Sequence, residues 1–218
     1  RLMLFTMGIG PVGGPFDTNP AHQKGMPNGY DDVSILTYEG LPASGGIDID
    51  TVYSTVNLKL FARTAPSVYL TYAETELMLA EAAELGFIED NAAIHYNNGV
   101  TAAMKMYGIF GPSFTISDDA IGQYLADQPY LPGSGLKMIG EQYWVVNFTN
   151  PIEAWSNWRR TGFPELVSVN YPGSMYNVQI PRRFLFPATE AAVNSDNYQD
   201  MISRQGADDW NTKIWWDK

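Results

Sequence analysis

From residue 66 onward, apolar residues recur at the spacing of an α-helix. The stretch 66–85 is one such segment, with Leu70, Ala73, Leu77 and Ala80 on one face. Gly86 then supplies a stop. The stretch 91–107 repeats the pattern before Gly108, with Ala93, Tyr96, Val100, Ala103, Met104 and Tyr107. The pattern predicts an antiparallel helical hairpin of about 40 residues, near the size of a tetratricopeptide-type repeat.

Further helices are expected in the second half of the chain. Ser117 is a suitable N-cap for a short helix through residue 126. The stretch 136–148 is apolar on most of its surface, which predicts a helix that is buried nearly all round. The stretch 151–161 would pair with it as a second hairpin. A final short helix is expected over 195–205, with Ser195 as its cap and Gly206 as its stop.

The helix predicted over 151–161 is rich in tryptophan and arginine. Asn150 and Glu153 have the spacing of a capping box, and Gly162 ends the pattern. Trp155 and Arg159 are four positions apart, so the guanidinium can stack on the indole. We interpret this segment as scaffold, with its arginines bracing the C-terminal tail. The alternative is an exposed aromatic platform for a sugar ring.

The first 65 residues have a different character, because Gly, Pro, Asn and Asp crowd them. This composition predicts loops with a few short strands, for which 2–7 and 56–62 are the candidates. Long irregular segments in a compact protein are often functional. We therefore expect region 1–65 to face the ligand and region 66–218 to be the scaffold, both within one structural domain.

Composition and charge narrow the classes of function. The 218-residue chain has a net charge of −11, from 13 basic and 24 acidic residues. This acidity argues against nucleic acid or an anionic membrane as a partner. The absence of cysteine excludes a disulfide, a thiol nucleophile and a zinc–thiolate site. No apolar run reaches the roughly 18 residues that a membrane span needs.

Catalysis has little support in the sequence. Four glutamates on the first predicted helix suggest acid–base chemistry, but we expect them to face solvent rather than a cleft: Glu74, Glu76, Glu81 and Glu84. His95 has no second ligand at metal-binding spacing. The loop aspartates 31–32, 48 and 50 resemble weak calcium ligands, although solvated side chains are the simpler interpretation. No cofactor is expected.

Five motifs in series carry a resemblance to a known family. In order they are YLTYAETELMLAEAAELGF, YNNGVTAAMKMYGI, EAWSNWRRTGFPEL, QIPRRFLFPATEAAVNSDNY and the terminal WWDK. Together they resemble the C-terminal half of SusD/RagB-type proteins, which are nutrient-binding lipoproteins of the outer-membrane surface of Gram-negative bacteria. Members are about twice as long as this chain, so the resemblance implies that an N-terminal half with a lipid-bearing cysteine is missing.

The resemblance implies both a fold and a function. The expected fold is mostly α, with tetratricopeptide-like hairpins, long irregular loops and a few short strands. The expected function is non-catalytic capture of an oligosaccharide for a TonB-dependent outer-membrane transporter. Two alternatives stay open, namely peptide or protein binding on the same scaffold and, with less support, a glycoside hydrolase.

The candidate ligand contacts are aromatic rings beside amide and carboxylate groups. A sugar stacks its apolar face on such rings and hydrogen-bonds through its hydroxyls. The candidates that fit are Phe16, Asn28, Tyr30, Asp31, Tyr38 and Tyr53, with Tyr171 and Tyr176 as a later set.

Overall fold

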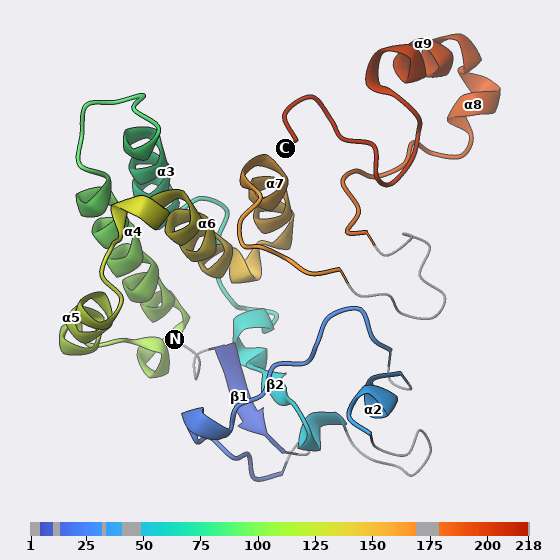
Figure 1. The fold of residues 1–218 in the computed structure, drawn as a ribbon. Helices are drawn as coiled ribbons and strands as arrows, with labels where there is room; N and C mark the ends of the chain where they lie inside the picture. Colours follow the sequence, from blue (N-terminus) through green and yellow to red (C-terminus); the bar gives the residue numbers. More distant parts are fainter. Residues whose placement is uncertain (1–4, 11–13, 32–33, 41–48, 169–178, 218) are drawn as a thin grey trace.

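The computed structural model describes residues 5–10, 14–31, 34–40, 49–168 and 179–217. The described part is mostly helical, with short strands only near its N-terminal end (Figure 1). The expected fold class is therefore confirmed. Single-turn 3-10 helices connect the larger elements, at Pro20–His22, Ile49–Thr51, Leu58–Phe61, Tyr107–Phe110, Pro112–Phe114, Pro132–Ser134 and Asn147–Thr149.

The predicted hairpin is present as α3 (Tyr72–Glu84) and α4 (Ala92–Met106). Thr71 begins α3 with a capping box, in which its side chain and Glu74 satisfy each other's backbone N–H groups. Gly86 follows α3 with φ of +73°, as a C-terminal glycine should. The Asn91 side chain caps α4 by accepting hydrogen bonds from the next turn. Local capping thus fixes both ends of the turn between the two helices.

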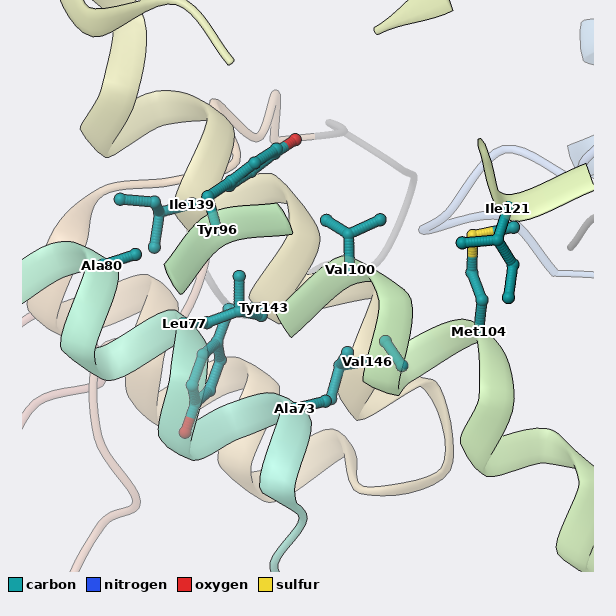
Figure 2. Packing of buried hydrophobic residues seen from close by; sticks show 11 residues of the cluster. Ala73, Leu77, Ala80, Tyr96, Val100, Met104, Ile121, Ile139, Tyr143 and Val146 are labelled. Atoms are coloured by element: carbon teal, nitrogen blue, oxygen red, sulfur yellow. The ribbon is translucent and has the colours of Figure 1, made fainter. Parts of the chain in front are cut away.

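Two further helices pack on this hairpin. Helix α6 (Gly135–Val146) lies against α3 and α4, and α5 (Asp118–Asp127) lies against α4 (Figure 1). Ser117 caps α5 as predicted. The main hydrophobic core lies between these helices (Figure 2), and its buried residues are Ala73, Leu77, Ala80, Tyr96, Val100, Ala103, Met104, Ile121, Ile139, Tyr143 and Val146.

The expectation that α6 is buried nearly all round was wrong for this chain. Ile139, Tyr143 and Val146 form one buried face, whereas Leu136 and Trp144 are only half-buried and Phe148, just beyond the helix, is exposed. The reason is that α3 and α4 cover a single side of α6, with α7 (Pro151–Thr161) packing beside it.

Helix α7 has the predicted bounds but not the predicted capping box. Asn150 makes no side-chain capping bond, and Glu153 instead accepts a 3.0 Å hydrogen bond from the Tyr143 hydroxyl on α6. Glu153 thus contacts a residue of another helix instead of the expected local partner, Asn150. Gly162 ends the helix with φ of +80°, as expected.

The loop-rich part holds a small antiparallel sheet of β1 (Thr6–Ile9) and β2 (Ser54–Val56), with α2 (Ser34–Tyr38) close by (Figure 1). The predicted strand 56–62 was wrong over most of its length. The Asn57 side chain accepts from the Lys59 N–H and starts the 3-10 helix Leu58–Phe61 instead. Such local side-chain bonds compete with strand pairing. The start of the strand predicted over 2–7 lies outside the described residues.

An aromatic cluster joins the sheet to the helices. Phe5 stacks on Phe148 at 4.5 Å between ring centroids and meets Tyr107 edge-on at 5.1 Å. Leu60, Tyr107 and Phe114 form the buried centre of this cluster. The loop-rich part is therefore packed on the scaffold rather than attached by a linker.

The C-terminal part contains α8 (Glu190–Val193) and α9 (Ser195–Gln205). Asn194, not Ser195, is at the cap position, although the helix ends at Gly206 as predicted. Segment 181–187, which precedes this part, forms neither helix nor strand.

A glycine sets the distance between α3 and α4. A Cβ on Gly99 would lie 2.8 Å from the Leu77 Cγ and 3.2 Å from the Ala73 carbonyl oxygen. Gly122 on α5 has open space around the same position. The two glycines thus provide a matched test of helix propensity against packing.

We expect Gly99→Ala to lower the free energy of unfolding by about 1–3 kcal/mol, because the added methyl group overpacks the interface. Gly122→Ala should instead raise it by up to about 1 kcal/mol through helix propensity alone. Urea denaturation of the two variants measures both effects. A Gly99→Ala variant as stable as Gly122→Ala would contradict the close packing.

Candidate functional site

Two of the predicted aromatic residues come together at α2. The rings of Tyr30 and Tyr38 are 4.9 Å apart between centroids, with 47° between their planes. Tyr30 is half-buried, whereas Tyr38 is 57% exposed. This pair offers an aromatic surface to solvent, which is the kind of surface that binds the apolar face of a sugar ring.

Tyr53 has a supporting place beneath this surface. It is only 3% exposed and packs with Ile35 and Leu36, while Tyr30 packs on the same cluster. Its hydroxyl donates a hydrogen bond to Glu39. Burial raises the pKa of the Tyr53 hydroxyl, and the hydrogen bond to the Glu39 carboxylate raises it further. The ring is therefore not available as a stacking face, in contrast to what the sequence suggested.

An ion pair lies beside the tyrosines. Lys24 Nζ is 2.5 Å from Glu39 Oε2 and 5.1 Å from the centre of the Tyr53 ring. The Lys24 ammonium, followed by the Tyr53 hydroxyl, lowers the pKa of Glu39. Sequence reasoning missed Lys24 and Glu39, because neither lies in a motif and the pair joins residues 15 positions apart.

The Asp31 side chain binds the first residue of α2 rather than reaching into solvent alone. Its Oδ1 accepts from the Ser34 N–H at 2.7 Å and from the Ser34 hydroxyl at 2.6 Å. Asn28 is exposed in the turn that precedes Tyr30. Both residues therefore lie within two positions of Tyr30 in sequence, on the segment that leads into α2.

Phe16 is half-buried and belongs to a different local structure. It precedes Asp17, which bridges to Ile9 in β1. Gly8 and Gly10, both with positive φ, let this segment approach, because a Cβ on Gly10 would lie 2.5 Å from the Pro15 carbonyl oxygen. Tyr171 and Tyr176, together with Asp32 and Asp48, lie outside the described residues.

A layer of alternating arginine and tryptophan holds the C-terminal tail. The Arg159 guanidinium lies 3.6 Å from the Trp155 ring centre and 4.6 Å from that of Trp216. The stacking predicted for Trp155 and Arg159 is thus confirmed. Arg159 also donates to the Arg182 carbonyl at 2.6 Å, and Arg182 pairs with Asp217. Arg160 turns the other way and forms a bidentate pair with Glu81 of α3.

The glutamates of α3 do not face solvent, contrary to expectation. Glu74 and Glu76 are buried, Glu81 pairs with Arg160, and Glu84 accepts a 2.5 Å hydrogen bond from Tyr130. Glu76, Glu81 and Glu84 each have a partner on a neighbouring helix or loop, whereas Glu74 is engaged in the capping box with Thr71. Each carboxylate therefore has the partner that burial of a charge requires. No group of three or more His, Cys, Asp or Glu suited to a metal ion occurs among the residues that the structure describes.

A family model described as "Starch-binding associating with outer membrane" matches residues 22–187. This match spans most of the chain. The chain belongs to the SusD-like family. A comparison with curated proteins found no match.

Solved structures agree with this assignment. A chitin-binding protein is 35% identical with a TM-score of 0.72, over 78% of this SusD-like chain and 37% of its own. A SusD-like protein of Bacteroidetes AC2a is 29% identical with a TM-score of 0.73, over 85% of this chain and 37% of its own. A SusD homologue of Bacteroides fragilis, at 24% identity and a TM-score of 0.66, shares the fold. The chain thus spans little more than a third of the first two relatives' length.

Among the described residues of this SusD-like chain, no helix is long and apolar enough to cross a bilayer.

His95 on α4 is a partly buried histidine that lies between two carboxylates. His95 Nδ1 lies 2.7 Å from Glu76 Oε2, and Nε2 lies 3.0 Å from Asp90 Oδ2. Glu76, followed by Asp90, raises the pKa of His95. The ring thus lies between α3 and the turn that leads into α4.

This histidine should make folding stability depend on pH. A raised folded-state pKa contributes stability that is complete below the unfolded value near 6.5 and is lost as pH rises through the folded value. His95→Gln should therefore flatten the loss of stability between about pH 6 and pH 9. At about pH 6 the substitution should cost about 1–3 kcal/mol, because Glu76 loses a partner.

Denaturant titrations of both proteins across this pH range would measure the effect. An equal slope in His95→Gln would rule out the proposed role of the His95 charge.

Proposed function

We propose that this protein binds an oligosaccharide without transforming it, and that the Tyr30–Tyr38 pair is the stacking surface. The observation that carries the proposal is this pair itself, an exposed ring supported by a buried hydrophobic cluster. Rigid support matters because a ring that is already ordered loses little freedom when a sugar stacks on it.

Polar groups around the tyrosines would give the sugar its orientation. Lys24 and Glu39 can exchange hydrogen bonds with hydroxyls at one side, and Asn28 and Asp31 supply an amide and a carboxylate on the segment before α2. A few such groups around an aromatic face are typical of carbohydrate sites. Phe16 and Tyr176 stay predictions, and Tyr53 acts in this proposal through its support of Tyr30.

The family match supports the carbohydrate as ligand. The family description names starch binding and association with the outer membrane, and one similar structure is titled a chitin-binding protein. We extend this to capture at the bacterial surface, where a lipid anchor outside this chain would hold the protein beside a TonB-dependent transporter. In this arrangement the loop-rich region 1–65 faces the ligand and region 66–218 is the scaffold.

A binding role fits the acidic groups of the site better than hydrolysis. A glycosidase needs two carboxylates across a cleft, one of them held protonated. Near the tyrosines, Glu39 pairs with Lys24 and has a lowered pKa, and Asp31 accepts hydrogen bonds from Ser34 at the start of α2. A lowered pKa is the opposite of what a catalytic acid needs.

Tyr38→Ala should weaken oligosaccharide binding about fivefold, equivalent to about 1 kcal/mol, through loss of one stacking ring. Tyr69→Ala is the matched control, because Tyr69 is 82% exposed but lies before α3, away from α2. Calorimetric titration with malto- and chito-oligosaccharides would measure both. Equal losses in the two variants, or no binding by the unchanged protein, would contradict the proposed site.

Peptide or protein binding is the second candidate function, and a groove favours it. A cavity of about 630 Å³ runs along α3 and α4, lined by apolar residues that include Val68, Leu70, Tyr72, Met106 and Ile109. An apolar helix-lined groove suits a peptide rather than a sugar. Peptide binding that Leu70→Asp removes and Tyr38→Ala leaves unchanged would favour this function.

A further inference from the structure

A second pocket lies far along the chain from the tyrosine pair. It has a volume of about 340 Å³ and is formed by α7, segment 183–187 and the end of α9. The residues that matter for its chemistry are Trp155, Arg159, Arg183, Phe184, Phe186 and Gln205. The pocket thus combines aromatic rings with two cations.

Both arginines are buried and each has an N–H group without a partner. Arg159 Nε and Arg183 Nη1 make no hydrogen bond with any described residue, although both side chains are more than nine-tenths buried. Their other nitrogens are engaged, as in Arg159 Nη1 to the Arg182 carbonyl and Arg183 Nη2 to Asp208. Unmade bonds of buried donors are uncommon in folded proteins, so two at one pocket indicate that an acceptor binds there.

The local charge points to an anion. The contacts around the pocket bring three guanidiniums, those of Arg159, Arg182 and Arg183, together with only two carboxylates, Asp208 and Asp217. Burial lowers the pKa of Arg159, and Asp217 opposes this effect. In a chain with a net charge of −11, this local excess of positive charge stands out.

The aromatic lining points to a ring-shaped ligand. Trp155 and Phe184 meet edge to face at 5.1 Å between centroids, and Phe184 is 67% exposed. A pyranose can therefore lie on Phe184 while a group attached to it enters toward the arginines. Segment 183–187 forms neither helix nor sheet, and a ligand oxygen reaches the covered nitrogens only when this segment moves.

We infer that this pocket is a second carbohydrate site, which binds the carboxylate of an acidic sugar residue such as a uronic acid. A carboxylate suits the site because guanidinium N–H groups match its two coplanar oxygens. The inference rests on the proposed function, since it takes the ligand to be an oligosaccharide. It adds that this protein binds two kinds of sugar residue, a neutral one at α2 and an acidic one at this pocket.

The test compares a disaccharide ending in glucuronic acid with the same disaccharide ending in glucose. Titrations are made in the Tyr38→Ala protein, so that the first site contributes little. We expect the acidic disaccharide to bind at least tenfold more tightly than the neutral one. Equal binding of the two sugars would overturn the inference.

Gln205 is exposed, so substitutions at this position test the pocket without disturbing the folded protein. Gln205→Glu adds a negative charge at the pocket and should weaken binding of the acidic disaccharide several-fold, whereas Gln205→Lys should strengthen it. Phe184→Ala should weaken it about fivefold through loss of the ring. Identical affinities in the two Gln205 variants would overturn the assignment, whatever happens in variants of the buried arginines.

A further arm identifies the source of the carboxylate. A tripeptide with a free C-terminus that binds as tightly as the acidic sugar would overturn the sugar as ligand. Failure of the proposed function has a different signature, in which neutral oligosaccharides do not bind the unchanged protein while the acidic disaccharide still responds to charge at position 205.

Discussion

The close contact between α3 and α4 is the constraint on which the other contacts of the scaffold depend. Gly99 lets the two helices approach until Leu77 lies against the backbone of α4. The hairpin then presents one continuous apolar face, and α6 packs on it (Figure 2). Interiors packed this closely transmit small changes, because side chains have few voids in which to relax.

Charged side chains link the α3–α4 hairpin to α7 and to the C-terminal tail. Glu81 on α3 holds Arg160 on α7, and the next residue toward the N-terminus, Arg159, stacks between Trp155 and Trp216. Helix α7 therefore connects the core on one side with the C-terminal tail on the other. The second pocket is formed where this connection meets segment 183–187. The position of the proposed second site thus depends on the ion pair between Glu81 of the central hairpin and Arg160.

The two proposed sites share a physical logic but differ in charge. At α2 an exposed tyrosine contacts a half-buried one, and a lysine–glutamate pair leaves the local charge balanced. At the second pocket, aromatic rings lie beside arginines that exceed their carboxylate partners. Aromatic rings supply stacking in both, and the charge determines which sugar each would accept.

The helices could be predicted from the amino-acid sequence, because apolar spacing, caps and stop glycines act within a few residues. The α3–α4 hairpin, α5, α7 and the stacking of Arg159 on Trp155 followed from such local patterns. The fold was needed to reveal the partners of Glu76, Glu81 and Glu84, the burial of Tyr53 and the contact of Lys24 with Glu39. These features join residues distant in the chain, and a charge or ring becomes buried only where another segment arrives to cover it.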